Sequence, residues 1–295
     1  MSPGESAVDE IVYLNGEYVP LAEAKIPVLD RGFIFGDGVY EVIPAYGRAL
    51  FRLREHLGRL DHSLRSIRIA NPYDAAEWSA LLERVVARNP WEDQSVYLQV
   101  TRGVAPRTQE FPKGDVRPTV FVMSSPLKMP TAEQRANGVA VVTRDDYRWQ
   151  RCDIKSVSLL ANCLLRQEAE DAGAVETILI RDGNVKEAST CNVFLVKNGL
   201  ILNPPKDHLI LHGITFDLAL ELADEAGLPL ETREVRREEL FEADEVWLSS
   251  SAREVLPVTL VDGKRIGSGK PGPVYARMYQ LFQDYKARTR AQAHA

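Results

Sequence analysis

Residues 151–180 read RCDIKSVSLLANCLLRQEAEDAGAVETILI, and they contain a lysine, a helical pattern and a strand in that order. The apolar residues between positions 159 and 172 predict a helix, and the β-branched run at 177–180 predicts a strand. A further strand is predicted upstream, at residues 139–143. Strands that alternate with helices indicate a mixed α/β chain.

The residues before this stretch predict sheet and helix as well. Asn15-Gly16 separates two short β-rich runs, and this dipeptide tolerates the positive φ of a tight hairpin turn. Leucines from position 53 onward recur at spacings of four and three, which predicts one apolar helix face. The same reasoning predicts a second helix at residues 78–85 and strands at 96–100 and 119–123.

A connection between two domains is predicted at residues 124–134, which are rich in proline and polar side chains. At about 150 residues per domain, 295 residues correspond to about two domains. We therefore expect an N-terminal α/β domain at residues 1–129 and a C-terminal α/β domain at residues 130–295. The second domain would carry the lysine of RCDIKS, with the functional site between the two domains.

Composition excludes several classes of protein. Hydrophobic residues make up 45% and charged residues 26%, as in ordinary globular proteins. The formal net charge is −6 with no basic stripe, so nucleic acid is not an expected partner. No apolar run is long enough to span a bilayer and the start lacks the pattern of a signal peptide, so we expect a cytoplasmic protein without membrane contact. The three cysteines form no CxxC pair, and no metal site is expected.

Several polar residues could carry chemistry, although each has an ordinary structural alternative. Lys155 precedes an apolar helix, and a lysine that loses hydration there forms imines with carbonyl groups, although most lysines are simply solvated. Glu187 follows a short turn, where a single carboxylate is usually a surface charge. Ile214 and Thr215 precede an amphipathic run, so their N–H groups would attract phosphate at a helix start, unless Thr215 merely caps the helix.

Two further groups complete a pattern. The three serines at 249–251 follow a predicted strand and offer hydroxyl and amide groups, although serines in a loop are usually a turn. Arg59 lies three residues from His56 on a predicted helix, a position that is equally typical of a surface helix. Together the chain supplies an imine-forming amine, an acid for a ring nitrogen and ligands for a phosphate. Those are the requirements of pyridoxal 5'-phosphate.

At this point the sequence resembles the fold-type IV pyridoxal-phosphate enzymes, also called class IV aminotransferases, over nearly its whole length. The resemblance implies a two-domain fold-type IV architecture. Five separated matches in the family's order are more specific than any one of them. They are DRGFIFGDGVYE at 30–41, EHLGRL at 55–60, RCDIKS at 151–156, Glu187 with NVF at 192–194, and GIT at 213–215.

The resemblance implies a role for each matching residue. Lys155 would hold the cofactor as a Schiff base and move the proton between substrate and cofactor, and Glu187 would pair with the pyridine nitrogen. The phosphate would be bound by Arg59, Thr215, Ser251 and the backbone amide of Ile214. Arg148 and Ser250 would lie near the cofactor or in its hydrogen-bond shell.

Within the family the chain is most similar to the D-amino acid aminotransferases, through GVYEV at 38–42, RGVAPR at 102–107 and RCDIKS. This likeness implies a ping-pong transfer from a D-amino acid such as D-alanine to a 2-oxo acid such as 2-oxoglutarate or pyruvate. Tyr40 and Arg107 would bind the substrate carboxylate. Gln109 stands where that branch has a histidine, and it donates hydrogen bonds without carrying a charge. The resemblance further implies a homodimer, in which Arg107 and residue 109 reach the partner's site.

Alternatives within the same fold remain open. The L-branched-chain aminotransferases share the lysine, glutamate and phosphate motifs, but where they have an arginine this chain has Pro44, within VYEVIP at 39–44. An (R)-amine transaminase is a second alternative. Aminodeoxychorismate lyase uses the same cofactor attachment, but its local motifs around Lys155 are not matched. A ligand-binding protein without catalysis is opposed by the presence of both Lys155 and Glu187.

Overall fold

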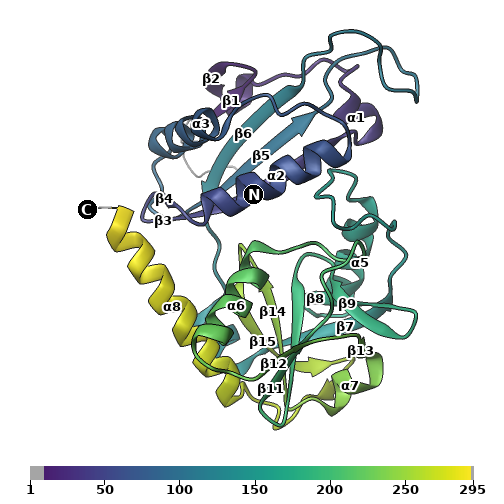
Figure 1. The fold of residues 1–295 in the computed structure, drawn as a ribbon, viewed down its shortest axis with the longest axis vertical. Coiled ribbons are helices and arrows are strands. Elements are labelled where there is room, and N and C mark those ends of the chain that lie inside the picture. The colour runs from purple at the N-terminus through teal and green to yellow at the C-terminus, as the bar shows by residue number, and fades with distance from the viewer. Residues whose placement is uncertain (1–9, 294–295) are drawn as a thin grey trace. The chain divides into compact units, whose positions relative to one another are not determined.

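The computed structural model describes residues 10–293, with side chains up to residue 290, and divides them into two compact units (Figure 1). The N-terminal unit contains the described residues up to Lys128 together with Ile154–Ser158. The C-terminal unit contains Met129–Asp153 and the residues from Leu159 onward.

The placement of Lys155 in the second domain is therefore wrong. Its segment packs with the N-terminal unit because its backbone pairs with strand β3 (Gly38–Tyr46). The Tyr40 N–H donates to the Lys155 carbonyl at 2.9 Å, and the Val157 N–H donates to the Gly38 carbonyl at 3.1 Å. The chain thus returns to the first unit for five residues after it has begun the second.

The N-terminal unit is built on an antiparallel sheet. Within the described residues the strand order is β2-β1-β6-β5-β3-β4. Asn15 and Gly16 both have positive φ at the β1–β2 turn, which confirms the predicted hairpin. The remaining elements are β1 (Ile11–Leu14), β2 (Glu17–Pro20), η1 (Leu21–Glu23), α1 (Arg31–Phe35), β4 (Ala49–Leu50), α2 (Leu53–Ser66), α3 (Ala75–Arg88), β5 (Gln94–Thr101) and β6 (Thr119–Pro126).

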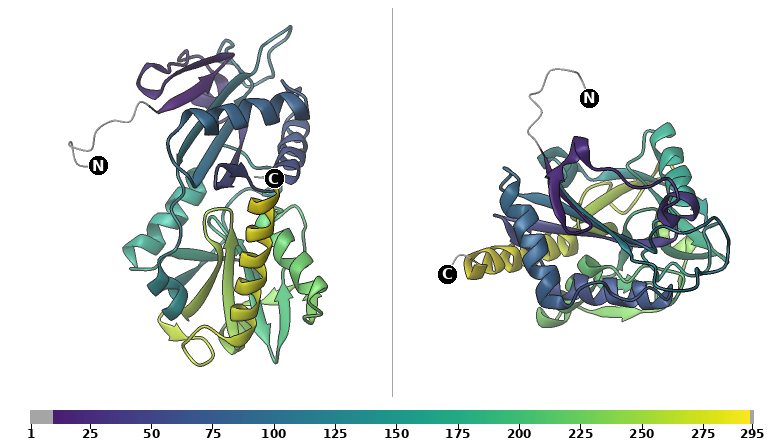
Figure 2. Two further views of the ribbon diagram at one scale, coloured as in Figure 1. Left: turned by 90° about the vertical axis from the view of Figure 1, so that its left-hand side faces the viewer. Right: turned by 90° about the horizontal axis from the view of Figure 1, so that it is seen from above.

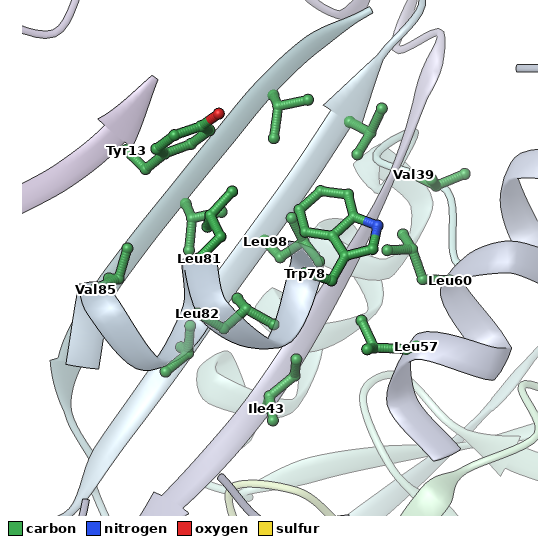
Figure 3. Close-up of a cluster of buried hydrophobic side chains, with 14 of the residues drawn as sticks. Tyr13, Val39, Ile43, Leu57, Leu60, Trp78, Leu81, Leu82, Val85 and Leu98 are labelled. Carbon is green, nitrogen blue, oxygen red and sulfur yellow. The ribbon is translucent and has the colours of Figure 1, made fainter. Parts of the chain in front are cut away.

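Helices α2 and α3 pack on one face of this sheet and enclose its core (Figure 3). The leucines of α2 face inward, as the spacing of four and three predicts. Trp78 of α3 lies fully buried beside Leu60 of α2 and Leu98 of β5. The opposite face of the sheet is half-buried and carries Tyr40 and Gln99 side by side on adjacent strands. One face is therefore left for a function other than folding.

The C-terminal unit contains a larger mixed sheet with the order β12-β11-β10-β14-β15-β7-β8-β9-β13 among the described residues, and β16 pairs with β15. Strands β7 and β8 are parallel and are joined by α5, whereas β14 and β15 form an antiparallel pair. The strands are β7 (Val139–Asp145), β8 (Glu176–Arg181), β9 (Asn184–Ala188), β10 (Asn192–Lys197), β11 (Leu200–Asn203), β12 (Leu230–Thr232), β13 (Val235–Arg236), β14 (Glu245–Ser250), β15 (Glu254–Val261) and β16 (Lys264–Arg265).

Helices cover this sheet. The long helix α8 runs along the sheet and packs against β15 and α6 (Figure 2). Phe194 of β10 stacks on both Phe216 of α6 and Trp247 of β14, with ring centroids 4.8 Å and 5.4 Å apart. This packing fixes the start of α6 above the strands that carry the polar residues described below. The helices are α4 (Ala132–Asn137), α5 (Leu160–Asp171), α6 (Ile214–Glu225), α7 (Arg237–Glu242) and α8 (Pro273–Ala293).

Candidate active site

Lys155 is half-buried and lies in the segment that pairs with β3. Its Nζ is 4.2 Å from the centroid of the Tyr40 ring, and its backbone N–H donates to Ser63 Oγ at 3.2 Å. The bridge between Val39 and Ser156 fixes the backbone on the other side of the lysine. The backbone around the lysine is therefore fixed, and the amine lies over an aromatic face.

Glu41, on the buried face of the same strand, binds two residues of α2. Arg59 donates to both carboxylate oxygens, from Nε at 2.8 Å and from Nη2 at 2.7 Å, and His56 Nδ1 lies 2.8 Å from Oε2. All three side chains are at least nine-tenths buried. The bidentate pair therefore fixes the Arg59 guanidinium, which is the group the sequence assigns to the phosphate.

Burial shifts the pKa values in this cluster in a predictable way. Burial alone would raise the pKa of Glu41, but Arg59 and His56 outweigh it and lower the pKa from 4.5 to about 2. Burial lowers the pKa of His56 below its usual 6.5. The positive charges of Arg59 and Lys155 lower it further, whereas the Glu41 carboxylate opposes the shift. Glu41 is ionised and His56 is neutral at pH 7.

This cluster predicts acid sensitivity. Because the pKa of Glu41 is depressed in the folded state, its stabilising contribution is present above pH 4.5 and is lost as the pH falls toward 2. His56, whose pKa is also lowered, adds a loss in the same direction as the pH falls below 6.5. We expect Glu41→Gln to lower the thermal midpoint at pH 7 and to flatten its decline between pH 4.5 and pH 2. Circular dichroism at a series of pH values measures both.

The control is Glu55→Gln on α2, the helix that carries both partners of Glu41. The Glu55 carboxylate is partly exposed and pairs with Arg54 at 3.4 Å and with Arg52 at 3.6 Å. This variant should keep the wild-type pH dependence, since exposed pairs contribute little. An unchanged slope in Glu41→Gln would contradict the assignment of acid sensitivity to this cluster.

Glu187, at the end of β9 in the C-terminal unit, is held by three donors. It accepts from Arg148 Nη1 at 2.6 Å, from the Leu211 N–H at 3.1 Å and from Asn192 Nδ2 at 3.4 Å. Burial raises the pKa of Glu187, and the Arg148 charge opposes that rise. Arg148 is itself fixed by the fully buried Asp146. The result is a buried acid in one fixed orientation, which suits a ring nitrogen better than a solvated surface charge does.

The start of α6 provides backbone donors. Gly213 precedes the helix without a side-chain cap, and the first residues, Ile214 and Thr215, are buried. An added Cβ at Gly213 would lie 2.1 Å from Asn192 Oδ1, so a larger residue there would displace the Asn192 side chain. Uncapped N–H groups at a buried helix start attract an anion.

The serine cluster lies at the end of β14. Ser249 is the cross-strand partner of Asn192, so both side chains are on the same face of the sheet. The Ser249 hydroxyl is buried and has no hydrogen-bond partner among the described residues, while Ser250 and Ser251 continue into the turn. An orphaned buried hydroxyl beside an uncapped helix start fits the phosphate of pyridoxal phosphate.

Two of the predicted substrate-binding residues, Arg107 and Gln109, lie on the loop between β5 and β6. Both residues are exposed. The Arg107 Cζ lies 5.4 Å from the Phe35 ring centroid, and Arg31 Nη1 donates to the Thr108 carbonyl at 2.6 Å. The structure thus brings Tyr40 to Lys155 within the N-terminal unit, and it leaves Arg107 and Gln109 exposed on the β5–β6 loop.

Sequence reasoning missed some residues that shape the site. Glu41 and His56 fall inside quoted motifs but received no role, and Asp146 had no motif to mark it. No sequence pattern links Asp146 and Arg148 to Glu187, because strands β7 and β9, which carry these residues or precede them, are joined only through β8 in the folded sheet. The described residues hold no cluster of His, Cys, Asp or Glu arranged to bind a metal ion, and none of their helices is long and apolar enough to cross a membrane.

Comparison with known proteins identifies the family. The family model for amino-transferase class IV matches residues 38–261. The chain is 44% identical to a D-alanine aminotransferase of Bacillus licheniformis over 92% of this chain and 96% of that protein. It is 39% identical to a D-alanine aminotransferase of Listeria monocytogenes over 92% of this chain and 94% of that protein.

Solved structures agree on the fold. The branched-chain amino acid aminotransferase of Escherichia coli superposes with a TM-score of 0.87 at 28% identity and covers 94% of both chains. A fold IV transaminase of Curtobacterium pusillum superposes with a TM-score of 0.78 at 28% identity and covers 90% of this chain and 93% of that one. The chain belongs to the class IV aminotransferases and has their fold-type IV architecture.

Proposed function

We propose that this aminotransferase moves the amino group of a D-amino acid, such as D-alanine, to a 2-oxo acid, with pyridoxal phosphate as its cofactor. The observation that carries the proposal is the 44% identity to a D-alanine aminotransferase over nearly the full length of both chains. The buried, fixed Glu187 and the lysine held over Tyr40 supply the acid and the amine that this chemistry requires.

In this proposal one cofactor molecule is bound by the residues that the resemblance assigns to it. Bound pyridoxal phosphate would supply an electron-withdrawing ring that stabilises the charge left when a proton leaves the substrate. Glu187 would keep the ring nitrogen protonated. The start of α6, Ser250, Ser251 and Arg59 would bind the phosphate, and Arg148 would orient Glu187.

Lys155 would do the proton transfer. Its backbone is fixed on both sides by hydrogen bonds, so the root of the side chain keeps one position during the transfer. Tyr40, 4.2 Å away, presents its ring to the amine and limits water on that side. The Lys155 amine would accept the proton from the substrate and deliver it to the cofactor.

Tyr40, Arg107 and Gln109 would bind the substrate carboxylate. We propose a homodimer in which the loop carrying Arg107 and Gln109 serves the site of the partner subunit. Exposed apolar side chains on the N-terminal unit support this, since Val28 is 73% and Phe33 is 70% exposed. Phe111, on the same loop as Arg107, is also exposed.

A second candidate is L-branched-chain amino acid transfer. The solved structures of branched-chain aminotransferases from Escherichia coli superpose well, which favours the shared fold. Their 28% identity is lower than the 44% shared with the D-alanine aminotransferase of Bacillus licheniformis. Pro44 lies in β3 opposite Ser95, where the L-specific branch has an arginine by resemblance. The D-amino acid assignment is therefore preferred.

The half-reaction without an amino acceptor tests the proposal. Purified protein is incubated with pyridoxal phosphate, and its visible absorption is followed after D-alanine, L-leucine or a chiral primary amine is added. We expect rapid loss of the visible band with D-alanine and slow change with the other two. Rapid change with L-leucine or the amine alone would overturn the substrate assignment, and no cofactor band at all would overturn the cofactor assignment.

A further inference from the structure

The turn between β14 and β15 is anchored by Arg253. Its Nη1 donates to Glu176 Oε2 at 3.1 Å, and its Nη2 donates to the Val175 carbonyl at 3.2 Å. The Arg253 backbone N–H donates to the carbonyl and the hydroxyl of Ser250, at 3.2 Å and 3.3 Å. One residue therefore binds the serine turn with its backbone and the start of β8 with its side chain.

Glu176 connects this turn to a third segment. Its carboxylate is fully buried and also accepts from the hydroxyls of Ser189 and Thr190, which lie in the turn between β9 and β10. That turn begins after Glu187 and ends at Asn192. The Arg253–Glu176 pair thus joins the loop of the proposed phosphate ligands to the loop beside the proposed ring-nitrogen acid.

The thiol of Cys191 lies in the same network, 3.5 Å from Arg253 Nη1 and 3.7 Å from Glu176 Oε2. Burial raises the pKa of this thiol to about 11, so it is a neutral group at pH 7. Glu176 is therefore the only anion that Arg253 meets in this network of described residues. Removal of the guanidinium would leave that carboxylate with neutral donors alone.

The next residue in the turn is anchored independently. Glu254 has a φ of +56°, a left-handed conformation that is uncommon for residues other than glycine. Its buried carboxylate binds Arg135 at 3.0 Å and Lys286 at 2.7 Å. These two ion pairs hold the start of β15 and involve neither Glu176 nor Ser250.

We infer that Arg253 is a positioning residue for the cofactor phosphate: its pair with Glu176 sets the place of the Ser250–Ser251 backbone and hydroxyl groups relative to Glu187. The inference rests on the proposed function, because it needs pyridoxal phosphate as the ligand. It adds a residue that would not touch the cofactor and acts only through the turn. Arg253 should therefore affect only the binding of the phosphate group, because the turn is proposed to contact no other part of the cofactor.

The test compares the affinity of purified Arg253→Met for pyridoxal phosphate with its affinity for pyridoxal, which lacks the phosphate. Both are measured from the visible absorption band, with thermal midpoints recorded for the cofactor-free proteins. We expect pyridoxal phosphate to bind about 10 to 100 times more weakly, the loss typical of charge-assisted hydrogen bonds, with pyridoxal affinity unchanged. Arg253→Lys should restore part of the loss, because it keeps the charge but not the two-point contact.

The matched control is Arg135→Met. Arg135 is buried to a similar extent, with 15% of its side chain exposed against 21% for Arg253, and it also pairs with a buried glutamate and a backbone carbonyl. Its loss should lower the thermal midpoint and leave the ratio of the two affinities at the wild-type value. Equal ratios for Arg253→Met and wild type, or equal falls in the ratio for both variants, would overturn the inference.

A double variant covers the case in which Arg253→Met folds poorly. Glu176→Gln with Arg253→Met removes both charges, and such neutral replacements are often tolerated. A recovered thermal midpoint with weak phosphate-dependent binding supports positioning, whereas recovery of both shows that the single variant lost only stability and overturns the inference. If wild-type protein does not bind pyridoxal phosphate, the proposed function fails instead, and the two failures are thereby distinguished.

Discussion

Replacement of Lys155 by alanine is expected to reduce D-alanine turnover by about 10⁴-fold, the upper end of what a positioned acid–base group contributes. The loss is large because one amine would both attach the cofactor and carry the proton, and no other lysine belongs to the described segment that pairs with β3. The visible band of the cofactor-loaded protein should also disappear. Steady-state kinetics and absorption spectra measure the two effects.

Two further variants sharpen this prediction. Lys155→Arg keeps a positive charge near Tyr40, but a guanidinium does not lose its proton at neutral pH, so the activity should fall as far as in Lys155→Ala. Lys264→Ala, which removes an exposed lysine from β16, should retain wild-type turnover. Substantial activity in both Lys155 variants would show that the amine is not the catalytic group.

Elements whose patterns are local could be predicted from the sequence. The β1–β2 hairpin follows from Asn15-Gly16, and α2 follows from leucines spaced by three and four. Strands β5, β6, β7, β8 and β14 also lie where apolar runs predict them. In each case the signal lies within the residues that form the element, so no knowledge of the rest of the fold is needed.

Features that depend on distant pairing could not be predicted. The five residues around Lys155 belong to the N-terminal unit because they pair with β3, more than a hundred positions earlier, and nothing in their own sequence reveals this. The short strand β13 could not be predicted, because it is completed by a partner elsewhere in the sheet. Propensity alone does not specify such pairings.

The candidate site likewise contains residues that the sequence identifies and supporting residues that it does not. Lys155, Glu187 and the start of α6 could be identified because each belongs to a motif with a chemical reason. The supporting residues could not, since Glu41 acts through Arg59 and Asp146 acts through Arg148. Their importance arises from burial and charge pairing, which only the folded arrangement shows.

Glu187→Gln is expected to lower kcat for D-alanine by about 10² to 10³-fold, the loss typical when one fixed electrostatic group is removed from a site. Glutamine has nearly the same size, but its single carbonyl oxygen can accept either from Arg148 or from the Leu211 N–H and not from both, so thermal midpoints are recorded beside the kinetics. Glutamine also carries no charge and would not keep the ring nitrogen protonated. The measurement is kcat and KM for D-alanine, together with cofactor affinity.

The comparison of the effect on kcat with the effects on KM and cofactor affinity shows which role Glu187 has. If the carboxylate acts on the ring electrons, kcat falls while KM and cofactor affinity change little, and Glu187→Asp, which keeps the charge, recovers part of the rate. If it only holds Arg148 and the Leu211 backbone in place, Glu187→Gln loses one of these two contacts, and cofactor affinity and the thermal midpoint fall together with kcat. A loss confined to kcat thus indicates an electronic role, and a loss shared by all three quantities indicates a structural one.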